Sequence, residues 1–444
     1  MKIIIAGAGE VGTHLAKLLS REDQDIILID SDEKKLRAFD SKLNIMTNVG
    51  NPTRIEVLKE AGVRGCDLFI AVTPHESLNI TACILAANLG AQKTVARIEN
   101  QEYLMPKNRE FFANIGVHEL IYPEMLATEE ILASLKQNWV RQQYDFGNGA
   151  LLLLGIKVRA NADILNIPLS ELTKSQTHYH LVAIKRNRET IMPRGNDEVK
   201  AGDIVYFTLK PEYVPEVKQV CGKKELDIRK IMIVGAGKIT VLTTNNAPEK
   251  MSIKIIEADT ERAQKIVEKV DRAMIIHGDP RNTELLKEEG IKNIDAYIAL
   301  SESAEENILS CLTAKKFGIR KTVAEVENID YIEMAESLDI GTVINKKLIA
   351  ASQIYRMLLE SKAVNVKCLT FADAEVVEMI AKENSKVTKK PVKELSLPKG
   401  ITFGGLVRKG EGILINGDTQ ILPGDIVIVF FLGTAIQKMD KYFN

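Results

Sequence analysis

The stretch that decides the fold reads Lys2-Ile3-Ile4-Ile5-Ala6-Gly7-Ala8-Gly9-Glu10-Val11-Gly12. Its apolar first half predicts a buried parallel strand. The segment His14–Leu19 that follows has the spacing of an amphipathic helix, and Asp25–Ile29 predicts a second strand that ends on Asp30. The order strand, glycine turn, helix, strand and acid is the context in which a G-x-G-x-x-G pattern predicts a dinucleotide site.

Each part of this pattern has its own physical role. Gly7 permits a tight turn, Gly9 lets the backbone approach a pyrophosphate, and Gly12 lets the helix pack on the sheet. The helix N-terminus directs free N–H groups and the positive end of its dipole at that diphosphate. Asp30 is placed to accept hydrogen bonds from ribose hydroxyls and would repel a 2′-phosphate, which favours NAD over NADP. The alternative is a Rossmann-like fold that binds no nucleotide and keeps its glycines for packing.

The composition is that of a folded protein with several domains. At 444 residues the chain is too long for one ordinary core. Its 59 lysines and arginines nearly cancel 60 aspartates and glutamates, so we expect no nucleic-acid partner. The longest apolar runs, near Leu151–Ile156 and Ile426–Leu432, have the length of strands and not of a bilayer span. We expect no secretory leader, and five scattered cysteines without a C-x-x-C pair fit a reducing cytoplasm.

The chain contains one unit twice. A spacing of 228 residues carries Gly7-Ala8-Gly9 onto Gly235-Ala236-Gly237. The same spacing relates three further pairs, namely Gly50-Asn51-Pro52 with Gly278-Asp279-Pro280, Asn79 with Asn307, and Arg97–Asn100 with Glu325–Asn328. Short β-rich runs with turn residues follow each copy, which predicts a small second lobe after each Rossmann-like lobe.

We therefore predict an α/β protein with two tandem Rossmann-like domains, each followed by a small α+β lobe. The predicted segments are a first Rossmann-like domain over 1–122, a crossover helix over 123–142, a small lobe over 143–223, a degenerate Rossmann-like domain over 229–345, a second crossover helix over 346–363 and a second small lobe over 364–444.

Other candidate ligand-binding residues follow the strands of the first copy. Thr73-Pro74 follows the predicted strand Cys66–Val72, at the edge where open α/β sheets bind ligands. The predicted strand Lys93–Ile98 leaves Arg97 near the same edge, where its guanidinium could hold a phosphate. The alternative is a surface cation paired with Glu99 or Glu102, and the residues leave both interpretations open.

The second copy departs from the pattern. Thr240 replaces the third glycine, and Thr243–Pro248 is a poor helix former that contains a proline. We expect the helix after the glycine turn to be lost and the phosphate cradle to be impaired. Glu257 keeps the acidic position, so it marks a candidate second site. Gly237-Lys238 is no P-loop, because Ile239 stands where serine or threonine would hold magnesium.

The repeated order of glycine turn, acid, Gly50-Asn51-Pro52-Thr53 and a β lobe with Ala201-Gly202-Asp203 resembles the peripheral NAD-binding subunits of Trk potassium-uptake systems. This is the TrkA family, built of tandem RCK (KTN) modules, and the resemblance covers the whole chain. It implies a cytoplasmic regulatory homo-oligomer, expected to be a tetramer, docked on a potassium-translocating membrane subunit. It further implies gating biased by NAD or NADH, with ATP or ADP as additional candidates.

By the same resemblance, the first NAD site would comprise Gly7, Ala8, Gly9, Glu10, Val11, Asp30, Thr73, Pro74 and Arg97, with Gly12 as the third glycine of the turn. The departures are the altered turn of the second copy and Asn51, where many relatives carry aspartate.

An NAD-dependent oxidoreductase is the rival interpretation, since a hydride-transfer enzyme needs an acid or base near the nicotinamide. His75 is the best-placed candidate for the acid or base. His178 and His180 form a pair that could be considered as metal ligands, but no acid or cysteine is expected nearby to complete a metal site. Each Rossmann-like domain is followed by a lobe of only about eighty residues, which suits moving lobes better than a substrate domain. We therefore predict a regulatory protein and no enzyme, with a sensor for another transporter as a further alternative.

Overall fold

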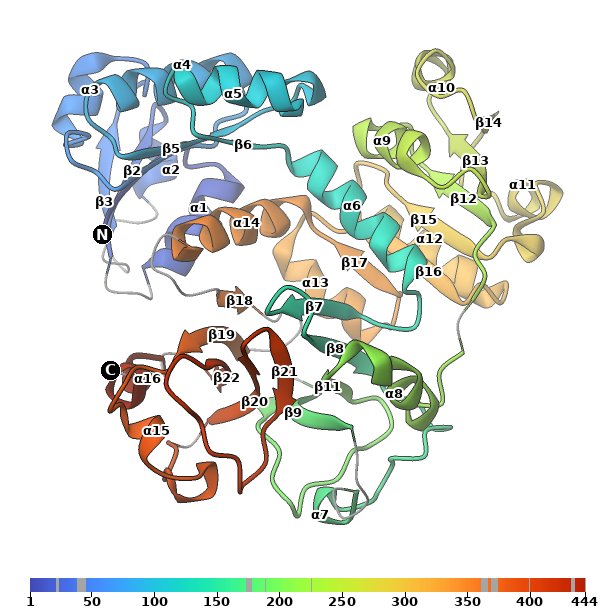
Figure 1. Ribbon diagram of the computed structural model, residues 1–444. Helices are drawn as coiled ribbons and strands as arrows, with labels where there is room; N and C mark the ends of the chain where they lie inside the picture. Colours follow the sequence, from blue (N-terminus) through green and yellow to red (C-terminus); the bar gives the residue numbers. More distant parts are fainter. Residues whose placement is uncertain are drawn as a thin grey trace. The chain divides into compact units, whose positions relative to one another are not determined.

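The computed structural model describes residues 1–20, 24–37, 45–172, 178–187, 189–224, 226–360, 366–368, 374–398, 400–432 and 436–443. Contacts divide the chain into two compact units, each built from two separate stretches (Figure 1). The first unit comprises Met1–Leu135 and Ile228–Leu358, and the second comprises Lys136–Asp227 and Leu359–Asn444. Each unit therefore joins the matching parts of the two sequence repeats.

The first Rossmann lobe is a six-stranded parallel sheet with strand order β3-β2-β1-β4-β5-β6. Its elements are β1 (Lys2–Ala6), α1 (Glu10–Leu19), β2 (Asp25–Asp30), α2 (Glu33–Arg37), β3 (Ile45–Val49), α3 (Ile55–Glu60), β4 (Leu68–Ala71), α4 (Glu76–Asn88), β5 (Lys93–Arg97), a 3-10 turn (Gln101–Leu104), α5 (Pro106–Asn114) and β6 (Glu119–Ile121). Ile3, Ile4 and Ile5 of the central strand are fully buried, because helices cover both faces of a parallel sheet.

The second Rossmann lobe repeats this sheet with the order β14-β13-β12-β15-β16-β17. Its elements are β12 (Lys230–Val234), α9 (Lys238–Asn246), β13 (Ser252–Glu257), α10 (Thr260–Val267), β14 (Ala273–His277), α11 (Thr283–Glu288), a 3-10 turn (Ile291–Asn293), β15 (Ala296–Ala299), α12 (Ala304–Lys316), β16 (Lys321–Glu325), α13 (Ile329–Ser337) and β17 (Thr342–Ile344). Both sheets have the strand order of the dinucleotide-binding Rossmann fold, so the predicted fold class is confirmed.

The expectation that the second copy loses its first helix was wrong. Helix α9 forms over nine residues, and Pro248 lies beyond its end. Low intrinsic propensity is overridden because the helix buries one face, which comprises Ile239, Thr240, Leu242, Thr243 and Thr244. Thr240 replaces the third glycine without breaking the turn, and its hydroxyl donates to the Gly235 carbonyl oxygen at 2.7 Å.

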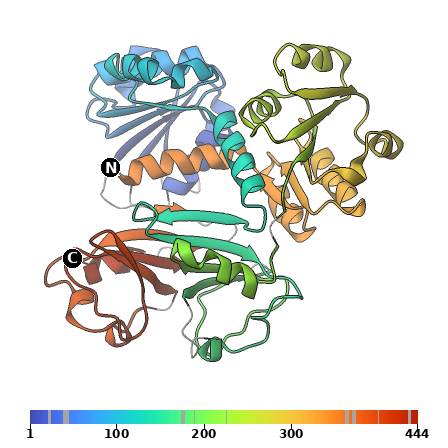
Figure 2. The same ribbon diagram turned by 45° about the vertical axis from the view of Figure 1, so that its right-hand side comes forward.

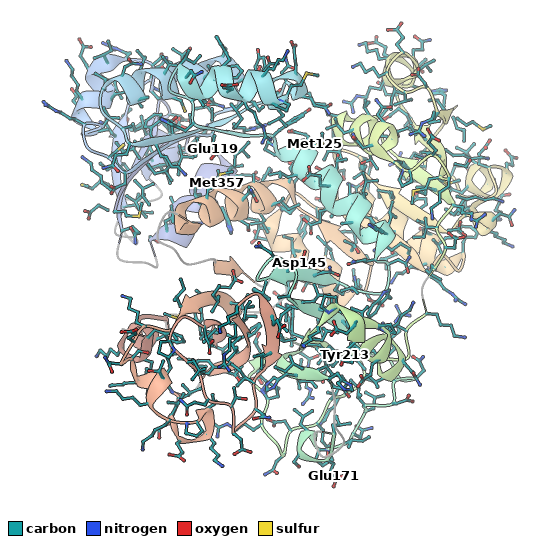
Figure 3. The ribbon with its side chains drawn as sticks, viewed as in Figure 1. Glu119, Met125, Asp145, Glu171, Tyr213 and Met357 are labelled. Carbon is teal, nitrogen blue, oxygen red and sulfur yellow. The ribbon has the colours of Figure 1, made fainter. Side chains whose placement is uncertain are left out.

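Two crossover helices pack between the Rossmann lobes. Helix α6 (Pro123–Lys136) follows β6, and α14 (Lys346–Glu360) follows β17. Figure 2 shows α14 against the first lobe and α6 against the second lobe, so each helix packs on the lobe opposite to the one that it leaves. Met125 of α6, labelled in Figure 3, belongs to an apolar cluster that contains Leu242 of α9.

The second unit contains two antiparallel five-stranded sheets, with the orders β10-β9-β11-β8-β7 and β18-β19-β22-β20-β21. The first lobe contains β7 (Gln142–Phe146), β8 (Leu151–Lys157), α7 (Leu169–Leu172), β9 (Tyr179–Arg186), β10 (Glu189–Ile191), β11 (Ile204–Leu209), a 3-10 turn (Pro211–Tyr213) and α8 (Val214–Val220). The second contains β18 (Val366–Cys368), β19 (Ala374–Ile380), α15 (Lys386–Lys389), a 3-10 turn (Val392–Glu394), β20 (Ile401–Arg408), β21 (Glu411–Leu414), β22 (Ile426–Leu432) and α16 (Ile436–Phe443).

Equivalent ion pairs brace the two lobes of the second unit. Arg186 donates to both carboxylate oxygens of Asp203 at 3.0 and 2.8 Å, and Arg408 does the same to Asp425 at 2.8 and 2.7 Å. Both aspartates are 2 % exposed. Such two-pronged pairs fix the hairpin that leads into the last strand of each lobe.

In the described part of the chain, no helix is both long enough and apolar enough to cross a bilayer.

Candidate functional site

The glycine turn of the first lobe is tied to the end of β2. Ala8 donates its N–H to Asp30 Oδ2 at 2.7 Å, and Asp32 donates its N–H to Asp30 Oδ1 at 2.8 Å. The Gly7 N–H donates to the carbonyl oxygen of Ile29 at 2.8 Å. The turn and the acid therefore meet at the carboxyl edge of the sheet, and each carboxylate oxygen keeps acceptor capacity for a ligand hydroxyl.

Gly7 and Gly12 are required by close contacts. Gly7 has φ = +112°, and a Cβ there would lie 3.0 Å from the Thr73 nitrogen. A Cβ at Gly12 would lie 1.9 Å from the Gly7 carbonyl oxygen. These contacts confine both positions to glycine and bring the turn against the loop after β4.

Gly9 differs, because its open side faces free space. No atom of the described chain lies within 4 Å of the position that a Cβ would occupy. Gly9 is thus not explained by packing inside the lobe, which leaves room for a group that approaches the backbone from outside.

A buried asparagine holds the two loops of this edge together. Asn79 is fully buried, and its Oδ1 accepts hydrogen bonds from the Thr73 N–H at 2.9 Å and the Thr73 hydroxyl at 2.6 Å. Its Nδ2 donates to the carbonyl oxygens of Thr73 at 3.0 Å and Arg97 at 2.9 Å. The sequence showed Asn79 only as part of the repeat, so this role was missed.

Arg97 lies at the same edge among acidic side chains. Its Nη2 is 3.7 Å from Glu99 Oε1 and 3.9 Å from Glu124 Oε1. Arg97 Nε and Glu124 Oε2 are buried and have no hydrogen-bond partner among the described residues. Burial, followed by the charges of Glu124, Glu99 and Glu76, raises the pKa of Tyr122 to about 12. The predicted pairing with Glu99 is therefore present but long, and the guanidinium keeps unused donors.

The other predicted residues occupy different surroundings. Val11 is buried in the lobe, and Pro74 is exposed. Glu10 forms an ion pair with Lys347 of α14. The structure thus brings Gly7, Ala8 and Asp30 together and draws the side chain of Glu10 to the opposite lobe.

The second lobe repeats the tie between turn and acid. Ala236 donates its N–H to Glu257 Oε2 at 2.7 Å, and Asp259 donates its N–H to Oε1 at 2.9 Å. Gly235 has φ = +96°, and Gly237 is open on its free side as Gly9 is. The acid and the turn are therefore arranged as in the first lobe, although glutamate replaces aspartate.

A cavity of about 260 Å³ lies over this second turn. Gly235, Gly237 and Glu257 contribute to its lining, together with Arg262 and Arg281. Arg262 pairs with Glu302 at 2.8 Å. Arg281 holds Asp279 through two hydrogen bonds of 2.9 Å, and this contact lowers the pKa of Asp279. Sequence reasoning missed both arginines, although Arg281 directly follows the repeated Gly278-Asp279-Pro280 motif.

The histidines of the rival interpretation show no catalytic arrangement. His75 is exposed and precedes α4 as its N-cap residue. The expectation that His178 and His180 have no acid nearby was wrong for His178, whose Nδ1 lies 2.9 Å from Glu216 Oε2. Its ring stacks on Tyr213, with ring centroids 4.0 Å apart. The described residues contain no group of three histidine, cysteine or acidic side chains that could hold a metal ion.

Comparison with known proteins identifies both kinds of lobe. The TrkA-N domain model matches residues 3–123 and 231–346, and the TrkA-C domain model matches residues 153–222 and 376–444. The Trk system potassium uptake protein TrkA of Azorhizobium caulinodans is 30 % identical, over 100 % of this chain and 99 % of its own length. The fold is similar to the GsuK RCK domain, with 13 % identity, a TM-score of 0.61 and coverage of 100 % and 94 %. The GsuK channel bound to NAD gives 13 % identity, a TM-score of 0.60 and coverage of 100 % and 78 %.

Proposed function

The chain belongs to the TrkA family, and we propose that it is the nucleotide-binding regulatory subunit of a potassium-uptake system. In this role it lies in the cytoplasm, is held at the membrane by a potassium-translocating partner, and couples nucleotide occupancy to gating. A ligand acts by binding one arrangement of the lobes more tightly than another. The proposal keeps the six predicted segments as its domains, with the first crossover helix ending at Lys136 instead of 142, because β7 begins at Gln142.

The observation that carries the proposal is the hydrogen bond between the glycine turn and Asp30 beside the open side of Gly9. We assign NAD or NADH to this edge. The N–H groups at the start of α1 face the diphosphate, and Asp30 accepts from the ribose hydroxyls. The unused donors of Arg97 are available to a phosphate, and Asn79 keeps Thr73 and Pro74 in place. The structure of GsuK with NAD supports this assignment by analogy of fold.

A second site in the other Rossmann lobe is part of the proposal. Glu257 would accept from a ribose, and the cavity over the turn has room for part of a nucleotide. The arginines Arg262 and Arg281 offer cations for phosphates if they exchange their present carboxylate partners. We propose NAD or NADH, with ATP or ADP as further candidates, as the ligand of this site.

We propose that the chain assembles into a homotetramer through exposed apolar side chains that occur on both Rossmann lobes. Phe111 on α5 is 57 % exposed, and Met334 on α13 is 44 % exposed. They occupy equivalent positions, because each is the sixth residue of its helix. A patch repeated on both lobes suits contacts that extend into a ring.

No catalytic step is assigned. The rival oxidoreductase would consume NADH in the presence of a 2-hydroxy acid, a 2-oxo acid or an aldehyde. Regulatory binding leaves the nicotinamide unchanged, so incubation of the protein with NADH or NAD and such substrates separates the two functions.

The direct test is potassium uptake by cells that depend on the matching membrane subunit. We expect the wild-type chain to support uptake and Asp30→Ala to alter its rate, while expression and unfolding temperature stay comparable. Uptake that is indifferent to the presence of the chain would contradict the regulatory role.

A further inference from the structure

The contact between the two Rossmann lobes is reciprocal. Glu10, the first residue of α1, pairs with Lys347 of α14. Lys238, the first residue of α9, pairs with Glu99 of the first lobe at 2.5 Å. In each lobe, the residue after the glycine turn therefore forms an ion pair with the opposite lobe. Ile98, Tyr122 and Leu242 form the apolar part of the contact and are buried.

The residues that meet at this contact carry opposite charges in the two copies. Glu10 and Lys238 are equivalent, since each begins the helix after the glycine turn. Glu124 and Lys347 are equivalent, since each is the second residue of a crossover helix. The strand-end acid is the exception, because Glu99 in the first lobe corresponds to Glu327 in the second.

The reversal decides which pairings are attractive. Between unlike lobes, Glu10 faces Lys347 and Lys238 faces Glu99. If two first lobes met in the same way, Glu10 would face Glu124 and Glu99. If two second lobes met, Lys238 would face Lys347 and also Glu327, the equivalent of Glu99. Like charges at close range destabilise a contact, so a pairing of two first lobes is disfavoured at both pairs, whereas a pairing of two second lobes is disfavoured only at the pair of Lys238 with Lys347.

The local electrostatics fit this role. The Glu99 pKa is lowered, first by the hydrogen bond from Lys238, so its carboxylate is held in the charged form. The Lys347 side chain is 18 % exposed and also lies 2.8 Å from Glu327, which fixes it in place for Glu10. The four side chains of the two pairs are partly exposed, so the pairs contribute more to the choice of partner than to stability.

We propose that the two Rossmann lobes recognise each other by this charge reversal, so that the first lobe accepts the second lobe as its partner and rejects a second copy of itself. The inference goes beyond nucleotide binding, because it concerns the side chains that the lobes present to one another, although Glu10 is also a predicted residue of the first NAD site.

The test is the exchange variant E10K/K238E in the full-length chain. It leaves the net charge unchanged and alters only two side chains whose ion pairs, among the described residues, cross between lobes. The lysine introduced at position 10 then faces Lys347, and the glutamate introduced at position 238 faces Glu99. We expect deuterium exchange of the segments around Ile98, Tyr122 and Leu242 to accelerate about tenfold at about 50 mM salt, and less at about 1 M, where the Debye length is about 3 Å.

Two controls keep the test decisive. The variant E60K/K292E exchanges two exposed charges on α3 and the Ile291–Asn293 turn, and it should exchange deuterium like the wild type. The neutral variants E10Q, K347Q and E10Q/K347Q form a double-mutant cycle, in which the double variant should lose less protection than the sum of the two single losses. Exchange of the central strands β1 and β12 reports whether the lobes themselves remain folded.

The proposal is overturned if E10K/K238E matches the E60K/K292E control. It is also overturned if the losses of protection in E10Q and K347Q add fully in E10Q/K347Q. Should E10K/K238E unfold, this double-mutant cycle decides alone.

Discussion

Ala8 donates its N–H to Asp30 Oδ2 over 2.7 Å, so the acid of the candidate site is also a brace of the glycine turn. The second lobe makes the same contact from Ala236 to Glu257. An acidic residue at this position therefore stabilises the glycine turn, and it is also placed to bind a ligand. Experiments on Asp30 must separate the two roles, and neighbouring glycines provide the means.

Gly9 and Gly12 give the first prediction. In Gly9→Ala the methyl group enters open space, so we expect the free energy of unfolding to change by less than about 0.5 kcal/mol. NADH affinity should fall at least about tenfold, because the methyl blocks the approach of a diphosphate to the backbone. In Gly12→Ala the methyl meets the Gly7 carbonyl, and unfolding should become easier by about 1–3 kcal/mol. Denaturant titration and calorimetry measure both quantities. Unchanged NADH affinity in Gly9→Ala would remove the diphosphate from this turn.

Asn79 and Asn307 give the second prediction. Asn307 clamps Ser301 and Glu325 as Asn79 clamps Thr73 and Arg97. Replacing either by alanine leaves buried backbone groups unpaired, and we expect each to cost about 3 kcal/mol in the free energy of unfolding. Only Asn79→Ala should weaken NADH binding after correction for the folded fraction. Equal weakening by both variants would show that Asn79 acts through general stability and not through the site.

Asp425 gives a prediction on pH. Although burial raises its pKa, the Arg408 hydrogen bond and further contacts outweigh that effect, so the folded pKa lies below the ordinary value. A carboxylate with a lowered folded pKa contributes stability above its unfolded pKa, about 3.9, and loses it as pH falls through the folded pKa. Stability of the second unit should therefore decline below about pH 4, and less steeply in Asp425→Asn. At neutral pH this variant should lose about 1–3 kcal/mol, because Arg408 loses its charged partner and keeps its hydrogen bond to the Gln420 carbonyl oxygen. Parallel acid curves for both proteins would contradict the assignment.

Replacement of Thr244 is predicted to raise the free energy of unfolding, in contrast to the changes above. Its hydroxyl is buried in α9 and finds no hydrogen-bond partner among the described residues. Thr244→Val keeps the shape and removes this polar group, so we expect a gain of about 0.5–1 kcal/mol in the free energy of unfolding. The equivalent residue of the first lobe is Ala16, which is likewise buried and apolar. Thermal unfolding of the variant provides the measurement, and a loss of stability would indicate a partner for the hydroxyl.

The fold was predictable because its signals are local and repeated. The glycine turn, the acid after β2 and the 228-residue spacing are read directly from the chain. Helix α9 was mispredicted because threonine and asparagine have low helix propensity, and only the three-dimensional structure shows the face that the helix buries.

The missed parts of the site depend on distant contacts. Asn79 joins two loops through hydrogen bonds to residues 6 and 18 positions away, and Arg262 enters the second cavity from a different helix. Repetition of Asn79 as Asn307 was the available signal. The sequence left Arg97 open between a phosphate ligand and a cation paired with Glu99 or Glu102. It did not indicate the contact with Glu124, which lies in a segment that periodicity alone placed in a crossover helix.

We predict that the first glycine turn and Asp30 hold NADH while the protein leaves it unconsumed. The most direct measurement is a calorimetric NADH titration of the wild type, Asp30→Ala and Glu257→Ala, with denaturation curves to confirm folding and an assay for NADH oxidation. We predict that Asp30→Ala weakens binding at least about tenfold, a change of about 1.4 kcal/mol, that Glu257→Ala leaves it within about twofold, and that no NADH is oxidised. The prediction would be contradicted by full NADH affinity in Asp30→Ala, by a loss of NADH affinity confined to Glu257→Ala, or by substrate-dependent oxidation of NADH.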